Sequence, residues 1–429
     1  MNLPETLEYI MKKIMDAGGQ VYLVGGALRD RLLGKPVTDY DLASSFPPDR
    51  IQEIFSAEKT WPSGKRFGTV TVMKNDISVE ITTFREESVY TDSRHPDRVV
   101  YVSDIRRDLA RRDFTINAMA YNPYHAEVFI DPFSGRKDLE NRIIRAVGSP
   151  VERFNEDPLR IMRGLRLAAQ LNFEIHQETL EAMRACYRDL NKVSAERLRT
   201  ELDRLLLSPH PDKGLLLLDE LGILSLLLQV KDARLDVQRT QIIKSIQPYL
   251  IYRFAALLFL LYFERDTTLP FSYDFWKNTL TRLRYDNKTI FHILNMLRSC
   301  FCFPDMEITP FTIRKLCGRM GAEDTRQILE LHKELQQIRK SPNMTDKLQE
   351  AELLLKWVID RNEPVFFHQL AINGNDVLQA GIGTENGRIV GEALNLAYEW
   401  VLENPALNQR DCLIMKLKEH YNSLQETSD

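Results

Sequence analysis

The sequence predicts an α+β protein, in which a mixed N-terminal part precedes a long all-helical part. Two observations support this prediction. Residues 1–135 contain short runs of alternating or β-branched residues between helical segments, which is typical of strands that pack with helices. Beyond residue 132 alternating runs almost disappear, and helical periodicity continues to about residue 421. With 429 residues, the chain should also form more than one domain.

The N-terminal part should begin with an amphipathic helix over residues 1–17, and a second helix, over 27–33, should follow the first strand. The polar segment 85–98 is expected to form a mobile loop. Proline and glycine mark breaks between the later helices near residues 149, 208, 268, 304, 341 and 374. Five segments have the pattern of strands: 21–24, 37–43, 68–73, 78–84 and 99–101.

The composition is that of an ordinary globular protein, with 44% apolar residues, 28% charged residues and a net charge of -4. This charge provides no global positive field for nucleic acid. Arginines nevertheless cluster within residues 106–112 and 160–166, and such local patches can bind phosphates.

Cysteine usage and hydropathy indicate the cellular setting. The five cysteines lack CxxC spacing, which argues against a zinc site or a disulfide framework and favours a reducing, cytoplasmic location. We find no signal peptide in residues 1–16. The longest apolar run, 254–263, is too short to span a bilayer, so no membrane partner is expected.

A pair of glycines and a pair of aspartates predict a metal and nucleotide site. Gly25 and Gly26 turn the strand 21–24 into a helix, whose N-terminus offers free N–H groups and a positive dipole end to a phosphate. Asp39 and Asp41 stand at i and i+2 of an extended segment, so their side chains share one face. An isolated DxD is usually a polar turn, but two carboxylates beside a phosphate-binding turn predict bound Mg²⁺.

Two further segments each allow two interpretations. Glu80 lies on the polar face of an alternating strand, either facing solvent or beside the aspartates, where it would tune the metal ligands or the attacking hydroxyl. Segment 111–119 has the residues of a helix start, which Asp113 or Thr115 could cap. Alternatively, Arg112 and Asp113 hydrogen-bond ribose hydroxyls and select ribose over deoxyribose.

Segment 156–166 is the candidate for base recognition. Glu156 and Arg160 could form a surface i, i+4 salt bridge worth only a few tenths of a kcal/mol. Alternatively, Asp157 and Arg160 read the amino donor and ring-nitrogen acceptor shared by cytosine and adenine, and reject guanine and uracil, which carry a carbonyl instead. Arg163 and Arg166 follow and could neutralise triphosphate or RNA phosphates.

Taken together, these residues resemble the class II tRNA nucleotidyltransferase family, which comprises CCA-adding enzymes and their relatives, the bacterial poly(A) polymerases. The similarity covers roughly residues 20–205 and continues more weakly over 370–391. Its motifs are residues 25–30, 39–41, 64–70, 85–96, 111–119, 156–166 and 194–202.

The resemblance implies a seahorse-like arrangement with a polymerase-β-type nucleotidyltransferase head and an all-α neck, body and tail. The head would be residues 1–137, the neck 138–212, the body 213–308 and the tail 309–429. Body and tail would hold the acceptor and T arms of tRNA. The implied roles are Mg²⁺ binding for Asp39 and Asp41, and triphosphate binding for Gly26 and Arg29, with Gly25 beside them at the nucleotide. Arg112 and Asp113 would recognise the ribose, and Asp157 and Arg160 the base. Arg163 and Arg166 would make further nucleotide contacts.

The implied activity is addition of CCA to the 3′ end of tRNA from CTP and ATP without a nucleic-acid template. A-adding, CC-adding and poly(A)-polymerase activities are the alternatives within the family. Residues 67–70 (FGTV) favour CCA addition over poly(A) synthesis, and residues 90–96 favour an enzyme able to add A. The absence of a His-Asp dipeptide argues against an attached phosphohydrolase domain.

Two other classes of protein compete with this interpretation. A catalytically silent RNA-binding protein would have broken carboxylates or a broken glycine turn, and both are intact here. A small-molecule nucleotidyltransferase would explain the glycine turn and the aspartates, but not segment 156–166 or the long helical part. The sequence leaves the oligomeric state open.

Overall fold

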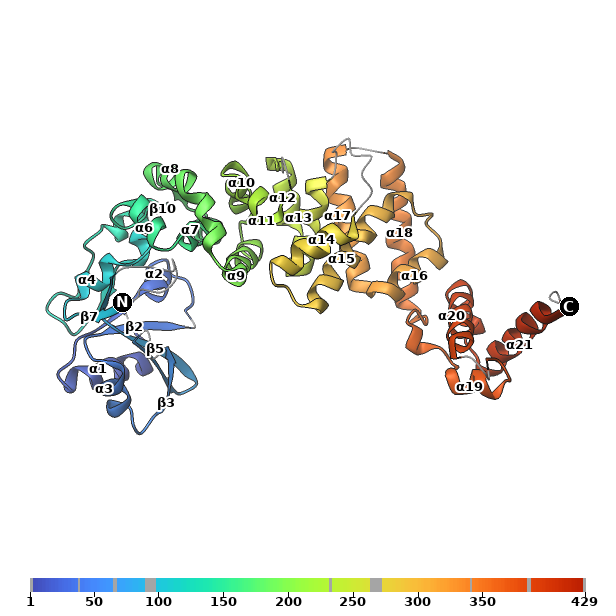
Figure 1. Ribbon diagram of the computed structural model, residues 1–429, viewed down its shortest axis with the longest axis horizontal. Coiled ribbons are helices and arrows are strands. Elements are labelled where there is room, and N and C mark those ends of the chain that lie inside the picture. The colour runs from blue at the N-terminus through green and yellow to red at the C-terminus, as the bar shows by residue number, and fades with distance from the viewer. Residues whose placement is uncertain are drawn as a thin grey trace. The chain divides into compact units, whose positions relative to one another are not determined.

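A computed structural model describes residues 3–37, 39–64, 68–88, 98–230, 234–262, 272–339, 342–383 and 387–426. The chain divides into two compact units, Met1–Arg234 and Leu235–Asp429. The first unit contains a mixed β-sheet and helices, whereas the described residues of the second unit form helices and connecting segments only (Figure 1). The predicted α+β class, with strands in the N-terminal part and helices after it, is confirmed.

A seven-stranded sheet has the order β3-β4-β5-β2-β1-β8-β9. Strands β2 and β5 pair in parallel, which places Asp41 directly opposite Glu80, and the other neighbours pair antiparallel. All four residues of β1 are buried, as expected for an uninterrupted apolar run in a sheet centre. The strands are β1 (Val21–Val24), β2 (Tyr40–Ser44), β3 (Lys59–Gly64), β4 (Thr69–Lys74), β5 (Ile77–Thr83), β8 (Ala120–Tyr121) and β9 (Phe129–Ile130).

Helices cover this sheet because each of them has an apolar stripe. Helix α1 (Glu5–Asp16) buries Leu7, Ile10, Met11 and Ile14, a spacing that places all four on one helical face. It packs against β1 and against α3 (Pro48–Ile54), which also contacts β4 and β5. Helix α4 (Ile105–Ala110) adds Ile105 and Leu109 to a core that includes Tyr22, Val24 and Phe84.

Helices α6 to α11 complete the first unit after the small helix α5 (Gly135–Glu140), and a two-stranded parallel ladder joins β10 (Ile143–Ile144) to β11 (Glu174–Ile175). Helix α7 packs against both α9 and α10. The six helices are α6 (Pro150–Glu156), α7 (Leu159–Leu171), α8 (Gln177–Cys186), α9 (Ala195–Leu206), α10 (Pro211–Glu220) and α11 (Ile223–Leu228).

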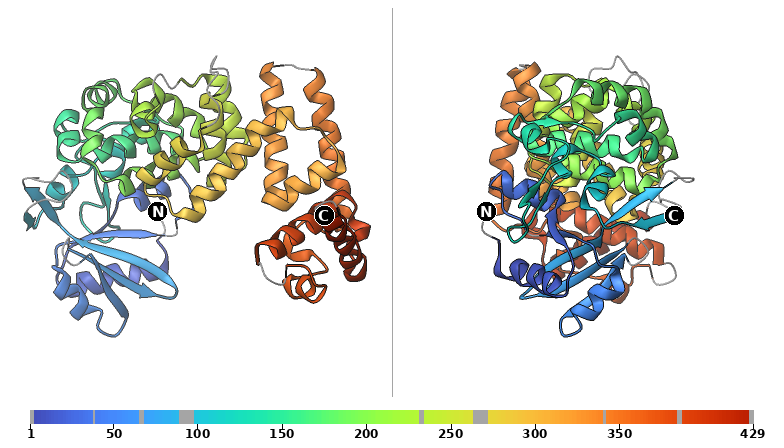
Figure 2. Two further views of the ribbon diagram at one scale, coloured as in Figure 1. Left: turned by 45° about the vertical axis from the view of Figure 1, so that its right-hand side comes forward. Right: turned by 90° about the vertical axis from the view of Figure 1, so that its left-hand side faces the viewer.

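Ten α-helices are described in the second unit, which Figure 2 colours from yellow-green to red. None of the helices in the described ranges is both long and apolar enough to cross a membrane. The ten are α12 (Val237–Ser245), α13 (Leu250–Tyr262), α14 (Tyr273–Arg282), α15 (Asn287–Cys302), α16 (Pro310–Met320), α17 (Ala322–Arg339), α18 (Pro342–Asp360), α19 (Gly374–Gln379), α20 (Gly387–Glu403) and α21 (Arg410–Glu426).

The structure corrects several expected elements. The strand expected over 37–43 begins only at Tyr40, so Asp39 lies in the bend that precedes it. The loop expected over 85–98 is wrong at both ends, because β6 (Arg85–Ser88) and β7 (Arg98–Tyr101) pair antiparallel. Residues 89–97 of that loop, like residue 67 of the FGTV stretch, lie outside the described residues. Strand β3 was not expected, since its sequence KTWPSG lacks alternation.

Candidate active site

The glycine turn is open on the side where the carboxylates lie. Gly25 begins helix α2 (Gly25–Leu32) with φ of +69°, a left-handed conformation that favours glycine. A Cβ at this position would lie 3.2 Å from Nη1 of Arg112 and 3.4 Å from Oδ2 of Asp41. Glycine therefore keeps free the space between a guanidinium, a carboxylate and the N-terminus of α2.

Three carboxylates gather beside this turn. Asp41 on β2 and Glu80 on β5 are register partners, and Asp39 precedes β2 directly; all three residues retain solvent exposure. Neighbouring protein atoms nevertheless partly desolvate the Asp41 carboxylate, and this burial raises its pKa to about 6. Arg112 opposes this shift, whereas the negative charges of Glu80 and Asp39 add to it. The cluster therefore has excess negative charge that a cation would neutralise.

The carboxylates at this site fit a metal ion that takes its remaining ligands from water and from a substrate phosphate. In the described part of the chain, no group of three or more His, Cys, Asp or Glu side chains could hold a metal. Mg²⁺ commonly takes only one or two carboxylates and completes its octahedron with water and substrate phosphates. Asp39 and Asp41, next to a helix N-terminus that suits phosphate, meet that requirement.

Arg29 is held in a fixed orientation within α2. Its Nε and Nη2 each donate to the Asp30 carboxylate at 2.8 Å, and its Nη1 donates to Oδ1 of Asn117, also at 2.8 Å. The residue is only 5% exposed. A Cβ added at Gly26 would lie 3.5 Å from Nη2 of Arg29, so this glycine keeps the space beside the guanidinium open. Gly26 and Arg29, two of the residues predicted to bind triphosphate, thus lie side by side.

Arg112 is oriented by a buried carboxylate that the sequence did not reveal. Its Nη2 donates to Oδ2 of Asp108 at 3.2 Å, and its Nη1 to the Asn117 carbonyl at 3.4 Å. Its Nε is buried without a hydrogen-bond partner among the described residues. Although burial raises the pKa of Asp108, Arg111 and Arg112 outweigh that effect and hold it below its usual value. The sequence signal that could have revealed these ion pairs is the helical spacing from Asp108 to Arg111 (i, i+3) and to Arg112 (i, i+4).

Asp113 is buried at the junction between the sheet and α7. Its Oδ1 accepts from the Phe114 N–H at 2.8 Å and from Nδ2 of Asn117 at 3.3 Å, and its Oδ2 lies 2.8 Å from Nη2 of Arg163. Although burial raises the pKa of Asp113, Arg163 and Arg160 hold it below the usual range. The segment that follows is a single 3₁₀ turn, Thr115–Asn117, and Phe114 occupies its cap position, so neither expected cap forms.

Asp157 and Arg160, the predicted base-reading pair, are each held by different hydrogen-bond partners. Asp157 ends α6, and its Oδ2 accepts from Nη2 of Arg197 at 2.7 Å. Arg160 donates through Nη1 to Oε2 of Glu156 at 2.6 Å and through Nη2 to the Arg111 carbonyl at 3.1 Å. The i, i+4 pair considered for the surface does form, but Arg160 is buried. Arg197 was missed because nothing local links α9 to residue 157.

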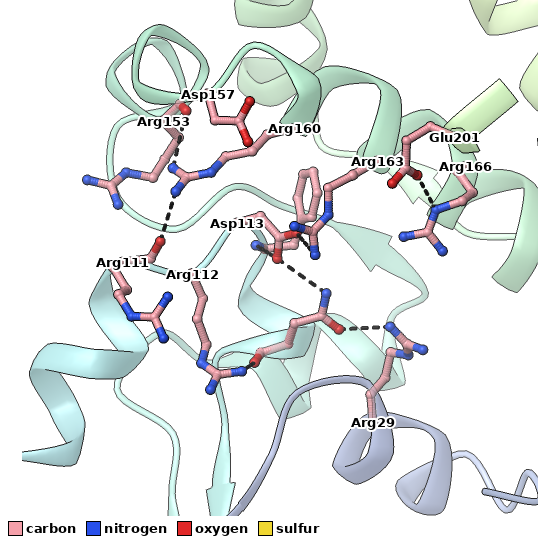
Figure 3. A network of polar contacts seen from close by, with 12 residues as sticks. Arg29, Arg111, Arg112, Asp113, Arg153, Asp157, Arg160, Arg163, Arg166 and Glu201 are labelled. Carbon is pink, nitrogen blue, oxygen red and sulfur yellow. Dashed lines mark hydrogen bonds and ion pairs between the residues drawn. The ribbon is translucent and has the colours of Figure 1, made fainter. Parts of the chain in front are cut away.

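The remaining two arginines of α7 have different surroundings, as Figure 3 shows. Arg163 faces Asp113 and remains 41% exposed along its side chain. Arg166 pairs with Glu201 of α9, with 2.5 Å between Nε and Oε2, and burial lowers its pKa. Arg163 therefore belongs to the network around Asp113. Arg166 instead links α7 to α9 through its ion pair with Glu201.

Residues 21–145 match the family described as "Poly A polymerase head domain", and residues 172–233 match the one described as "Probable RNA and SrmB- binding site of polymerase A". The chain is 35% identical to the curated CCA-adding enzyme of Streptococcus thermophilus, over 94% of each chain. A local match to the CCA-adding enzyme of Streptococcus gordonii reaches 47% identity over 54% of this chain and 57% of that protein. The crystal structure of the Bacillus stearothermophilus CCA-adding enzyme in complex with CTP superposes with a TM-score of 0.78, at 26% identity, and covers 99% of this chain and all of that one.

Proposed function

Because this chain belongs to the family of CCA-adding enzymes, we propose that it adds C, C and A to the 3′ end of tRNA from CTP and ATP, without a nucleic-acid template. It is a nucleotidyltransferase. The tRNA 3′-hydroxyl attacks the α-phosphorus in line, and pyrophosphate leaves. The observation that supports this activity best is the open glycine turn, with Asp41 and Arg112 on either side of the space that a Cβ at Gly25 would fill.

Asp39 and Asp41 would hold Mg²⁺ beside the triphosphate. The bound ion would supply positive charge that lowers the pKa of the attacking hydroxyl and neutralises the leaving pyrophosphate. Glu80, opposite Asp41 in the sheet, adds negative charge that strengthens cation binding. The pKa of Asp41 is raised first by burial and further by the charges of Glu80 and Asp39, against the opposing effect of Arg112, so a bound cation would relieve the cost of ionising this carboxylate.

The nucleotide lies across the N-terminus of α2. Gly25 and Gly26 expose backbone N–H groups to the triphosphate, and Arg29 supplies a fixed positive charge beside them. Arg112 and Asp113 receive the ribose hydroxyls. Oδ1 of Asp113 accepts from Phe114 and Asn117, whereas its buried Oδ2 forms an ion pair with Arg163 but accepts no hydrogen bond among the described residues, which leaves Oδ2 for a ribose hydroxyl.

Asp157 and Arg160 select cytosine and adenine. Asp157 accepts from the exocyclic amino group, and Arg160 donates to the ring nitrogen. Half-buried partners hold both side chains in place, Arg197 for Asp157 and Glu156 for Arg160, so binding of a carbonyl-bearing base would leave a polar group unpaired at this place and is disfavoured. Arg163 and Arg166 add positive charge along α7.

The neck, body and tail of the chain bind tRNA. Residues 1–137 form the head, 138–212 the neck, 213–308 the body and 309–429 the tail. The match of residues 172–233 to a family described as an RNA-binding site supports an RNA contact that begins in the neck. Body and tail hold the acceptor and T arms.

Primer extension on three tRNA transcripts tests this function: one lacking CCA, one ending in C and one ending in CC, each with CTP, ATP or both. Completion of CCA on all three is the expected result. Extension of the CC-ended transcript alone, by one A, indicates an A-adding enzyme; arrest after CC indicates a CC-adding enzyme; and long A tails indicate a poly(A) polymerase. No incorporation with Mg²⁺ present refutes the enzymatic function and favours a silent RNA-binding protein.

A further inference from the structure

A buried arginine joins the last helices of the chain to α16. Arg314 on α16 is 4% exposed, and its Nη1 donates to the carbonyls of Leu402 and Glu403 at 2.8 and 3.3 Å. These two residues end α20, and the last turn of a helix leaves its carbonyls without partners inside the helix. A cation at this position satisfies the carbonyls and meets the negative end of the helix dipole. Arg314 therefore caps α20 from a different helix.

A carboxylate from a third segment completes this joint. Nε of Arg314 donates to Oε2 of Glu363 at 2.6 Å, and the Glu363 side chain is only 10% exposed. Glu363 follows α18, so one guanidinium links α16, the chain beyond α18 and the end of α20. The guanidinium carbon also lies 5.3 Å from the ring centroid of Trp357 on α18. A charge buried this deeply requires its counter-charge and its hydrogen bonds, which makes the geometry of the joint specific.

The neighbouring turn of α16 fits closely against α20. A Cβ at Gly318 would lie 2.2 Å from Oη of Tyr398 on α20 and 2.2 Å from the Val365 carbonyl oxygen. The Tyr398 hydroxyl donates to that same carbonyl at 2.7 Å. Residues at i and i+4 lie on one helical face, so Gly318 and Arg314 together define how α20 packs against α16.

Helices α19 to α21 form a bundle with a core of its own, called here the C-terminal bundle. Its buried cluster includes Val377, Ala397 and Leu413, and the members of that cluster in the described part of the chain all lie between residues 370 and 421. Because α16 contributes no described side chain to this core, the bundle can keep its fold when the joint is altered. The joint therefore determines the orientation of the bundle more than its folding.

We propose that Arg314 is a positioning residue for tRNA, which fixes the C-terminal bundle against α16 so that both bind one tRNA molecule in a single orientation. This inference rests on the proposed function, in which residues 213–429 hold the acceptor and T arms. A binding surface made of two parts loses affinity when the parts move independently, since binding must then order them. The predicted nucleotide site lies in the first unit, so nucleotide KM should not depend on Arg314.

The test measures kcat and KM of Arg314→Gln with two RNA primers that lack CCA: a full tRNA, and a hairpin of its acceptor stem alone, which has no T arm. Glutamine keeps a donor but loses the charge and the guanidinium fork. We expect KM for tRNA to rise about tenfold, whereas KM for the hairpin, KM for CTP and kcat stay within about twofold of wild type. Arg314→Lys retains the charge without the fork and should give an intermediate KM for tRNA.

A matched control is Arg253 on α13, which is also 4% exposed and also caps a helix. Its Nε donates to the Ile246 carbonyl at 3.0 Å and its Nη2 to the Lys244 carbonyl at 3.3 Å, where α12 ends. Arg253→Gln removes an equally buried cap that does not involve the C-terminal bundle. It should lower the melting temperature and leave KM for tRNA at the wild-type value.

Three results would overturn the inference: wild-type KM for tRNA in the folded Arg314 variants, an equal rise of KM for the hairpin and for tRNA, or an equal rise of KM for tRNA in Arg253→Gln. If Arg314→Gln does not fold, Arg314→Lys provides the test. Anisotropy of labelled tRNA measures the same loss of affinity without catalysis. A wild-type protein that incorporates no nucleotide would therefore refute the proposed activity, while the tRNA affinities of the variants still decide this inference.

Discussion

Asp41, which is predicted to bind Mg²⁺, carries an electrostatic cost to the folded state. Its carboxylate is close to Asp39 and Glu80, and its pKa is raised to about 6. Charge placed for a ligand rather than for the fold is expected at an active site, where stability and function are opposed. The effect of the ionised Asp41 carboxylate on the free energy of unfolding can therefore be measured in the metal-free protein.

Asp41→Asn should stabilise the metal-free protein at pH 7. A folded-state pKa near 6, above the unfolded value of about 3.9, means that ionisation disfavours the native state. The cost is complete above pH 6 and disappears as pH falls below 4, where both states are protonated. Because the residue is partly exposed, we expect a gain of about 1 kcal/mol at pH 7. Urea unfolding in EDTA from pH 4 to pH 7 measures it; a variant less stable than wild type at pH 7 contradicts this account.

Asp108→Asn should have the opposite effect on stability. The pKa of Asp108 is held below its usual value, so its ionised form stabilises the native state above pH 4, and this contribution is lost as pH falls through the folded pKa. Breaking a buried ion pair costs about 3–5 kcal/mol, and asparagine retains part of the hydrogen bonding, so we expect about 2–3 kcal/mol. Unfolding at pH 7 provides the measurement, and nucleotide KM should rise because Arg112 loses its orientation. An unchanged midpoint would refute the structural role of the pair.

Asp157→Ala should relax base selection while tRNA still binds. Removal of the carboxylate eliminates the acceptor that distinguishes an amino group from a carbonyl, so incorporation of UTP and GTP relative to CTP and ATP should increase about tenfold or more. Single-turnover incorporation with each nucleotide measures this ratio. Selectivity equal to that of wild type would remove Asp157 from base recognition.

Short elements carry the site, and α7 connects them. Arg160 and Arg163, one turn apart on α7, reach the Arg111 carbonyl and the Asp113 carboxylate, respectively. Arg166, on the next turn, pairs with α9 instead. The N-terminal half of this helix therefore contacts the segment that holds the residues predicted to read ribose, so its packing should influence their position.

Gly164→Ala should disturb that packing. A Cβ at Gly164 would lie 2.5 Å from Cε of Met183 and 2.9 Å from Cζ of Phe114, and the latter residue follows Asp113. We expect a loss of about 1–3 kcal/mol from overpacking, together with a raised nucleotide KM. The control is Gly391 in α20, where an added Cβ meets nothing within 4 Å. Gly391→Ala should stabilise the protein by up to about 1 kcal/mol. Equal effects of the two substitutions in urea unfolding would contradict the packing argument.

At the scale of the whole molecule, all predicted nucleotide-site residues lie in the first unit, and the second unit contributes helices. Nucleotide chemistry and tRNA binding should therefore be separable by mutation. The net charge of -4 gives the chain no overall attraction to RNA, so tRNA binding must depend on local basic patches.

Asp41→Ala should abolish nucleotide incorporation and retain tRNA binding in Mg²⁺-containing buffer. Binding of tRNA should weaken steeply with added salt in both proteins, because phosphate contacts release counterions. Fluorescence anisotropy with labelled tRNA, at salt concentrations from about 50 to about 300 mM KCl, tests both statements. Loss of tRNA binding in the variant, or full incorporation by it, would disprove the assignment.

The sequence by itself determined the α+β class, the family and the local signals of the site. These features are local: the glycine turn at Gly25, the Asp39 and Asp41 pair and the helical period of α7 are each encoded within a few residues. Elements without a local pattern, such as β3 and β6, were missed because tertiary pairing, not alternation, makes them strands.

Only the tertiary structure decided how the site residues are held. Asn117 meets Arg29 across 88 positions of the chain, and Arg197 meets Asp157 across 40. No periodicity encodes such partners, since a hydrogen bond between distant residues depends on how the sheet and helices pack. Buried polar groups are stable only when they are hydrogen-bonded, and in this fold their partners come from other motifs of the chain. The separate motifs are therefore joined in one hydrogen-bond network.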